Sequence, residues 1–572
     1  MQKYYHKGVI KSGYLCRSLA GVRVKALDIN GNILAESISG KQGEYKVETE
    51  APINTISFEL AGYILKRITN TNSDDNFIRL LENKIIGYQP KLWFNPGEDI
   101  DVYINSPVNY KATLIRHGIK TSSILNLGTF TSQLQTLPDS KFVKEGLGWE
   151  KSFSYKLPAF IEPGIYSLDI QSVESKESYR LSFLVSTPPS EYGKKTKLLV
   201  LASTNNWQTY NVWGGRSRYR NFEDEARLSL KDRIYIMGVK TIPEGLRAKI
   251  KEMLGNNIVV TEKDHPNAWQ FKELGVNRPH PNCSVIDDDP YVPFTSHLTA
   301  GEWRVLAWLE REKYSYDIVS GNELHNNPDL LLNYNALILN THCEYWSREM
   351  FAGLETFNNN GGSILNLSGN SIYREITFMQ GGNNIRCVSL RYEKSAGDET
   401  QVIGVRFDMR GYGNCSPYTI LNSKHWTFKG LNIPENNEFG KQSLNNPSGG
   451  AEGDDFNPVK PGMLTQLNGN GGSGWETDKI SPSAPKDIKL IAKGTNKNNG
   501  GADMIIREFG KTRGMLFSAS SITFGGTLLV DEVSSGIVNN VLRHIKNYNS
   551  AKTNKTEEKD TISNLSPLSQ NL

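Results

Sequence analysis

Apolar and polar side chains alternate in short runs over the first part of the chain. Residues 22–26 and 45–47 are examples, and turn-forming pairs such as Asn30 and Gly31 separate the runs. A period of two places every second side chain on the same face of a strand, so runs of this kind between turns indicate half-buried β-strands. We therefore predict a small β-sandwich over residues 1–86.

A second β module is predicted over residues 87–188. A Pro-Gly turn at residues 96–97 leads into the alternating residues 99–104, and another Pro-Gly turn at 163–164 precedes a further strand pattern. Proline fixes the backbone of such turns, and the alternation that follows turns one face of each strand toward a single core, as in immunoglobulin-like sandwiches. The polar, proline-containing stretch 187–195 is a stiff linker that ends the module.

Continuous apolar runs replace the alternation after residue 196. The apolar runs cover residues 197–202, 336–339 and 362–367, and helix-like stretches cover 300–311 and 347–357. Parallel strands buried on both faces have such unbroken runs, and their alternation with helices indicates an open α/β sheet. We predict one large α/β open-sheet domain, glutamine-amidotransferase-like, over residues 196–548, with its ligand site at the carboxyl ends of the strands. The polar, repetitive residues 549–572 are predicted to form a disordered tail.

Composition narrows the classes of partner. The chain has 65 Lys and Arg against 61 Asp and Glu, and the basic residues are scattered, so no nucleic acid is expected as a partner. No run approaches the roughly 18 apolar residues of a membrane-spanning helix, so no membrane is expected either. The five cysteines lack paired spacing, which favours a reducing compartment. Residues 1–14 contain no apolar segment of the signal-peptide type, so we expect a cytoplasmic protein; a leader lost by trimming of the start site would make it extracellular instead.

Two polar clusters follow predicted strands at the points where the chain leaves the sheet. The first cluster, residues 205–219, contains Tyr210 and Asn211 among aromatic and glycine residues. The second contains His342 and Glu344 directly after an apolar run. Because the carboxyl ends of parallel strands meet at one edge of a sheet, these side chains are expected to line one pocket, and a carboxylate at such a place needs a partner. We predict a small-molecule site here.

The order of motifs across the α/β region resembles that of the N,N-dimethylformamidase large (β) subunit family. The motifs are Tyr-Asn-x-Trp-Gly-Gly-x-Ser-x-Tyr at 210–219, Asn-x-Leu-His at 322–325, His-x-Glu-Tyr-Trp-Ser at 342–347, Leu-Ser-Gly-Asn at 367–370, Gly-Trp-Glu-Thr-Asp at 474–478 and Phe-Ser-Ala-Ser-Ser-Ile at 517–522. Each motif alone is weak, and their shared order makes the resemblance specific. The first module, with Gly-Val-Arg-Val-Lys-Ala-Leu-Asp at 21–28, resembles transthyretin-like, carboxypeptidase regulatory-like β-sandwiches.

The resemblance to the dimethylformamidase family implies hydrolysis of the carbon–nitrogen bond of a small amide at a mononuclear iron. In that family two tyrosines and one glutamate hold the iron, and a tyrosine with an ordinary pKa near 10 needs a strongly Lewis-acidic ion to stay deprotonated. Matched by motif, Tyr210 is one tyrosine ligand and Glu344 is the carboxylate ligand. His342, Glu344 and Asn211 are then the expected catalytic residues.

The third ligand is the point at which this sequence departs from the family pattern. Relatives carry Arg-Pro-Tyr where this chain has Arg-Pro-His at 278–280. The predicted metal set is therefore Tyr210, His280 and Glu344, and because imidazole binds either ion, zinc is the alternative to iron. Tyr219 and Tyr291 remain alternative ligands.

Two other functions compete with the amide hydrolase. Cys343 beside His342 suggests a cysteine nucleophile, but the glycine-flanked elbow that such enzymes use is missing, and Ser368 lies in the segment that looks most like one. A non-catalytic binding or assembly protein would keep the pocket for ligand recognition alone. The expected partners are a small amide substrate and either a second copy of the chain or a small accessory subunit.

Overall fold

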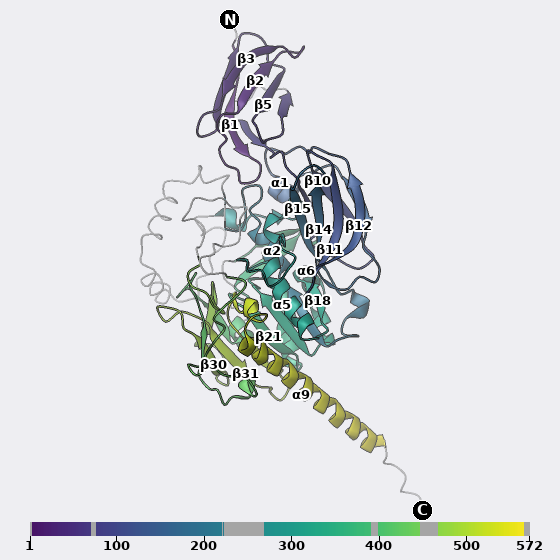
Figure 1. The fold of residues 1–572 in the computed structure, drawn as a ribbon, viewed down its shortest axis with the longest axis vertical. Helices are drawn as coiled ribbons and strands as arrows, with labels where there is room; N and C mark the ends of the chain where they lie inside the picture. The colour runs from purple at the N-terminus through teal and green to yellow at the C-terminus, as the bar shows by residue number, and fades with distance from the viewer. Residues whose placement is uncertain are drawn as a thin grey trace, which may run out of the picture.

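The computed structural model describes residues 3–69, 76–219, 221, 268–389, 398–446 and 467–564. In these parts the chain is rich in strands, which gather into two groups of small sheets and one large sheet. Figure 1 shows the N-terminal strands at one end of the molecule, the second group of strands beside the large sheet, and the last helix projecting from the opposite end. The molecule is thus a multidomain, β-sandwich-like and strand-rich protein.

The first module packs two sheets face to face. Its strands are β1 (Tyr4–Ser12), β2 (Arg23–Leu27), β3 (Ile33–Ile38), β4 (Glu44–Thr49), β5 (Thr55–Glu59), β6 (Lys66–Thr69) and β7 (Asn76–Leu80), in the orders β4-β1-β7 and β3-β2-β5-β6. The alternation along β2 explains its place: Val24 and Ala26 are fully buried, while Arg23 is exposed. Val24 packs in one core with Ile56 and Phe58 of β5.

The second module also pairs a small and a larger sheet. Its strands are β8 (Ile86–Tyr88), β9 (Trp93–Phe94), β10 (Asp99–Asn105), β11 (Tyr110–His117), β12 (Ser122–Phe130), β13 (Phe153–Lys156), β14 (Gly164–Ser172) and β15 (Ser178–Val185). They form sheets in the orders β13-β10-β8 and β12-β11-β14-β15-β9, and the short helix α1 (Phe142–Glu145) follows β12. A separate core cluster, which includes Ile100, Leu114 and Leu168, lies under these strands.

The large sheet has the order β18-β16-β19-β21-β32-β31-β30-β26-β27. Its strands are β16 (Leu198–Ala202), β18 (Asp317–Ser320), β19 (Ala336–Thr341), β21 (Ser363–Ser368), β26 (Tyr418–Ile420), β27 (Glu438–Phe439), β30 (Lys489–Gly494), β31 (Asp503–Arg507) and β32 (Leu516–Ser518). The first five strands in this order pair in parallel, and the remainder pair antiparallel. The predicted apolar runs thus form neighbouring strands of one mixed sheet.

Helices and smaller sheets complete this region. The helices are α2 (Thr204–Tyr210), α5 (Thr299–Arg311), α6 (Gly321–Asn326), α7 (Arg348–Asn359), α8 (Glu399–Ile403) and α9 (Glu532–Asn564), with 3₁₀ turns at η1 (Pro189–Glu191), η3 (Ala268–Phe271), η4 (Pro281–Cys283), η5 (Pro328–Asn333), η6 (Gln380–Gly382), η7 (Trp426–Phe428) and η8 (Phe524–Thr527). The smaller sheets are β17 (Leu274–Gly275), β23 (Asn384–Cys387), β22 (Arg374–Met379) and β20 (Tyr345–Trp346), then β24 (Val405–Asp408) with β29 (Thr477–Ile480), and β25 (Cys415–Ser416) with β28 (Ser473–Gly474).

The C-terminal helix is longer than the sequence pattern indicates. Residues 549–572 are predicted to form a disordered tail, whereas α9 runs to Asn564; residues 565–572 lie outside the described part. Its first turns are held by apolar burial, since Ile537, Val538 and Val541 are fully buried in the large core. Among the described helices none is long and apolar enough to cross a bilayer.

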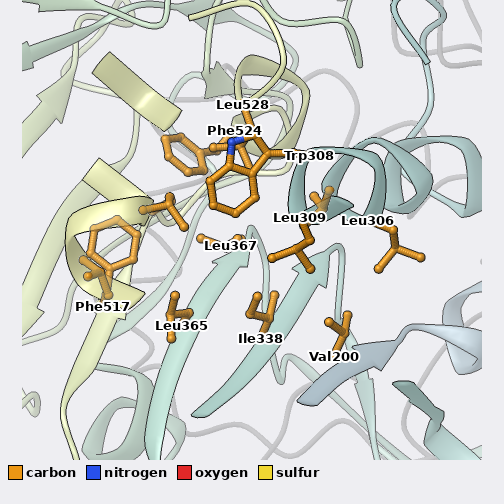
Figure 2. Packing of buried hydrophobic residues seen from close by; sticks show 14 of the residues in the cluster. Val200, Leu306, Trp308, Leu309, Ile338, Leu365, Leu367, Phe517, Phe524 and Leu528 are labelled. Carbon is orange, nitrogen blue, oxygen red and sulfur yellow. The ribbon is translucent and has the colours of Figure 1, made fainter. Parts of the chain in front are cut away.

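The core of the large region lies between α5 and the parallel strands. Figure 2 shows Val200, Ile338 and Leu365 on neighbouring strands beneath Leu306 and Leu309 of α5. All five side chains are fully buried, because α5 covers this face of the parallel strands. This packing fixes the ends of β16 and β19, from which the polar clusters emerge.

Ile338→Val tests how tightly this layer is packed. We expect the free energy of unfolding to fall by about 0.5–1.5 kcal/mol, since a methylene is lost from a filled core. Ile29→Val is the matched control, because Ile29 is 78% exposed and its change should stay within about 0.5 kcal/mol. Denaturant unfolding of both variants gives the measurement, and equal effects would contradict the assignment of Ile338 to the core.

Candidate functional site

Two tyrosine hydroxyls converge on one buried carboxylate. The Tyr219 hydroxyl donates to Glu344, 2.6 Å from Oε1 and 2.8 Å from Oε2, and the Tyr210 hydroxyl lies 2.8 Å from Oε2. The two hydroxyls are 3.3 Å apart. The Glu344 side chain is completely buried, so these contacts replace the water that an exposed carboxylate would have.

The sheet explains why these residues meet. Tyr210 is the last residue of α2, which begins two residues after β16, and Glu344 follows the end of β19, the strand beside β16. Tyr219 returns to the same place because the loop after α2 is closed by a hydrogen bond from the Arg218 N–H to the Thr209 carbonyl. The cluster therefore lies at the carboxyl ends of parallel strands, the expected position in an open α/β sheet.

Arg374 balances the charge of Glu344. Its Nε lies 2.6 Å from Glu344 Oε1, and its side chain is 17% exposed. Burial by itself would raise the pKa of Glu344, but Arg374, His342 and the Tyr219 hydroxyl together lower it well below its ordinary value. Glu344 is therefore an ionised, fully paired carboxylate.

His342 presents one defined nitrogen to the cluster. Its Nδ1 lies 2.9 Å from the Gly369 carbonyl, which can only accept a hydrogen bond, so Nδ1 carries a proton. Nε2 then faces the Tyr210 hydroxyl at 3.0 Å and Glu344 Oε2 at 3.3 Å. Burial would lower the pKa of His342, yet the hydrogen bond to Glu344 and the charges of Glu476 and Glu344 outweigh it and raise the pKa to about 8.

A second carboxylate lies near Nε2 of His342. Glu476 Oε2 is 3.7 Å from His342 Nε2 and accepts a hydrogen bond of 2.9 Å from the Asn370 side-chain amide. Burial raises the pKa of Glu476, and the charge of Glu344 raises it further. The backbone N–H of Asn370 donates to Asp478 at 2.8 Å, and this hydrogen bond holds Asn370 in place beside Glu476. Two carboxylates with oppositely shifted pKa values thus flank one imidazole, an arrangement suited to proton transfer.

The chemistry of the donor set suits a metal ion. Oxygen ligands about 2.0–2.2 Å from an ion lie about 3 Å from one another, and the oxygens of Tyr210, Tyr219 and Glu344 are separated by 2.6–3.3 Å. Burial raises the pKa of both tyrosines above the ordinary value, so without an ion both remain neutral phenols. Over the described ranges no group of three His, Cys, Asp or Glu side chains is placed to hold a metal, which leaves this tyrosine and carboxylate set as the candidate.

The structure brings together only part of the set expected from sequence. Tyr210, His342 and Glu344 meet, and Tyr219, an alternative ligand, joins them. The remaining expected residues make other contacts: His280 binds the Arg278 carbonyl through Nδ1 at 2.7 Å, Asn211 donates to the Pro279 carbonyl at 2.8 Å and accepts from the Trp213 N–H at 3.0 Å, and Tyr291 is 40% exposed.

Cys343, the candidate nucleophile of the rival enzyme class, is buried among polar groups. Its Sγ lies 3.0 Å from Ser203 Oγ, and burial raises the pKa of the thiol to about 12. A protonated, buried thiol is a poor nucleophile.

Several residues of the cluster have weak or no signals in the sequence. Arg374 reaches Glu344 because β22 pairs with β20, which places Arg374 opposite Tyr345, and this pairing has no local pattern. The Tyr345 hydroxyl in turn donates to Tyr219 at 2.8 Å. Glu476 lies in the Gly-Trp-Glu-Thr-Asp motif, and this motif is the feature of the sequence that points to it as a site residue.

Together, the fold and the cluster define a multidomain, strand-rich protein with a buried centre of tyrosine, glutamate and histidine beside a parallel group of strands. The family model described as N,N-dimethylformamidase beta subunit-like, C-terminal, matches residues 112–535, and the chain belongs to that family. The first module lies before the matched residues. No curated protein sequence matches the chain.

Solved structures share only local likeness with the chain. The α2-macroglobulin of E. coli is 11% identical over 30% of this chain, with a TM-score of 0.11, and this chain spans only 11% of its length. The major pilin subunit of Bacillus cereus is 9% identical, with coverages of 36% and 74% and a TM-score of 0.14. The shaft pilin of Lactobacillus rhamnosus GG is 9% identical, with coverages of 32% and 94% and a TM-score of 0.12. TM-scores this far below 0.5 establish no shared fold.

Proposed function

We propose that the protein is a metal-dependent hydrolase that cleaves the carbon–nitrogen bond of a small amide. The observation that carries the proposal is the convergence of the Tyr210 and Tyr219 hydroxyls on the Glu344 carboxylate in a chain of the dimethylformamidase β subunit-like family. These three residues would hold the ion, iron before zinc, because two phenolate oxygens and a carboxylate are hard ligands. When bound, such an ion polarises an amide carbonyl and lowers the pKa of water.

The surrounding residues suit the proton transfers that amide hydrolysis needs. His342 Nε2 would accept the proton of the attacking water and deliver it to the amide nitrogen as the carbon–nitrogen bond breaks, so that the amine leaves neutral. Because the Gly369 carbonyl holds the Nδ1 proton, Nε2 is the ring nitrogen that would gain and lose the transferred proton. Glu476, held by the Asn370 side-chain amide, would help to orient the imidazole through its contact with Nε2. Arg374 would fix the Glu344 carboxylate in one orientation.

The wider architecture and assembly belong to the same proposal. The parallel strands β18-β16-β19-β21-β32 support a glutamine-amidotransferase-like open sheet in the α/β region. The name of the matched family refers to a β subunit, which supports assembly with a second copy or a small accessory chain.

Elemental analysis of protein purified without added metal, with an assay of amine release from a panel of small amides, tests the proposal. We expect near-stoichiometric iron or zinc in the wild type and a loss of metal affinity of at least about tenfold in Tyr210→Phe. Tyr334→Phe is the matched control, because Tyr334 is also a buried phenol that donates to a carboxylate, Asp317, at 2.8 Å.

Metal-free wild-type protein that stays folded would contradict the hydrolase. In that case Arg374 would already balance the charge of Glu344, so no metal ion would be needed there. The alternative, a protein that binds a small ligand without turnover, would then be favoured.

A further inference from the structure

The N-terminal β-sandwich contacts the loop that joins the two site tyrosines, Tyr210 and Tyr219. This loop, residues 211–219, leaves α2 after Tyr210 and ends at Tyr219, and it turns at Gly214 and Gly215, both of which have positive φ. The turn contacts the first module. Its contacts therefore bear on where Tyr219 is placed.

Both backbone groups of Gly214 are bound by the first module. The Gly214 N–H donates to the Tyr14 carbonyl at 2.6 Å, and the Gly214 carbonyl accepts from Arg79 Nη1 at 3.0 Å. Arg79 is the fourth residue of β7 and is fully buried, with its guanidinium 4.9 Å from the centre of the Phe142 ring. A buried guanidinium must be satisfied by acceptors, so the Gly214 carbonyl and Arg79 hold each other in place.

The turn is also enclosed sterically. A Cβ on Gly215 would come within 2.4 Å of Cys16 Cβ in the first module, and one on Gly214 would come within 2.4 Å of the Phe142 ring in the second. Only glycine fits this close approach, since the positive φ and the missing side chain are both needed. The turn is thus packed closely against Cys16 of the first module and Phe142 of the second.

The large region holds the rest of the loop through a second buried arginine. Arg278 donates to the carbonyls of Trp213, Arg216 and Asn211. These carbonyls lie on both sides of Gly214 in sequence, so Arg278 fixes the flanks while the first module fixes the centre. The backbone is therefore held both at Gly214 and on either side of it, so the turn cannot shift without breaking one of these hydrogen bonds.

We propose that the N-terminal β-sandwich is a positioning element of the site, and that Arg79 and the Tyr14 carbonyl hold Gly214 so that Tyr219 stays beside Tyr210 and Glu344. The family match covers residues 112–535, so this module, residues 1–86, lies outside the matched part of the chain. The consequence for metal affinity rests on the proposed function, whereas the bracing of the loop does not.

Hydrogen–deuterium exchange of the full-length protein tests the bracing without reference to activity. In Arg79→Gln, exchange of the amides in residues 211–219 is expected to be at least about tenfold faster, the size that loss of one charge-assisted hydrogen bond predicts. Arg79→Lys keeps a cationic donor and should restore part of the protection. Lys25→Ala removes an ion pair with Glu59 within the same module and should leave the loop unchanged. Exchange in β16 and β19 should be unchanged in all three.

Gly215→Ala disturbs the same contact from the loop side if Arg79→Gln unfolds the first module. Adding Cys16→Gly removes the clashing Cβ, and Cys16 has a φ of 57°, which glycine tolerates. We expect the double variant to exchange more slowly over 211–219 than Gly215→Ala alone. Equal exchange in these two variants, or an unchanged loop in a folded Arg79→Gln protein, would overturn the proposal.

Ferric citrate is the probe for the link to the site. Tyrosine bound to ferric iron absorbs visible light, so the absorbance measures binding directly, and we expect about tenfold weaker binding in Arg79→Gln than in wild type. If the wild type binds no iron, the proposed hydrolase fails while the exchange data still decide the bracing. If iron binds equally well to wild type and to an Arg79→Gln protein with a loosened loop, the positioning role for Tyr219 is overturned.

Discussion

Glu344→Ala is expected to abolish metal binding and to destabilise the protein by about 3–5 kcal/mol. The first effect follows because the two tyrosine hydroxyls lose the acceptor on which they converge, and loss of a ligand should weaken metal binding more than the roughly 10–100-fold seen for groups behind ligands. The second follows because Arg374, 17% exposed, loses the carboxylate that balances its charge. Elemental analysis and denaturant unfolding measure the two effects separately.

A second substitution distinguishes the two effects of Glu344→Ala. Glu344→Ala with Arg374→Met should regain much of the lost stability, because no buried charge is left unpaired, but it should not regain metal. Glu323→Ala is the control: its carboxylate is also buried and bound by hydroxyl groups, those of Ser186 and Ser320, and its loss should leave metal content unchanged. Metal retained in Glu344→Ala would remove Glu344 from the ligand set.

The strands that position the site can be predicted from the local pattern of apolar residues, and the reason is physical. The apolar runs at 197–202, 336–339 and 362–367 become β16, β19 and β21, since a strand covered on both faces is mostly apolar along its length. The positions of Tyr210 and Glu344 follow as well, because each leaves the sheet at the carboxyl end of such a strand. The proximity of Tyr210 to Glu344 is therefore predictable from the sequence.

The remaining members of the cluster depend on pairings that leave no local trace. Arg374 lies beside Glu344 through the parallel pairing of β20 with β22, and Tyr219 returns to Tyr210 through a loop closed by one backbone hydrogen bond. The sequence favours His280 as the third ligand and gives Tyr219 as an alternative, and the structure shows a hydrogen bond to Glu344 for Tyr219 and one to the Arg278 carbonyl for His280. Contacts between segments distant in sequence, such as Gly214 with Arg79, lie equally beyond a local pattern.

His342→Asn is expected to lower kcat for amide hydrolysis by about 100- to 10,000-fold while metal content stays near that of wild type. An asparagine amide can still donate to the Gly369 carbonyl in place of Nδ1, but it has no nitrogen at the position of Nε2, 3.0 Å from the Tyr210 hydroxyl. The substitution therefore removes Nε2, the atom proposed to transfer the proton, and keeps the hydrogen bond to the Gly369 carbonyl. KM should change little, since no metal ligand is lost.

His325→Asn is the matched control for this prediction. His325 also uses Nδ1 for a short-range contact, 2.8 Å from Ser347 Oγ, and it packs beside Phe378 rather than within the tyrosine cluster. Its substitution should leave kcat unchanged. A fall in kcat of His342→Asn matched by an equal loss of metal would instead make His342 a support of the ligands, because a group that only moves a proton does not determine metal occupancy. The ratio of activity to bound metal separates these two roles.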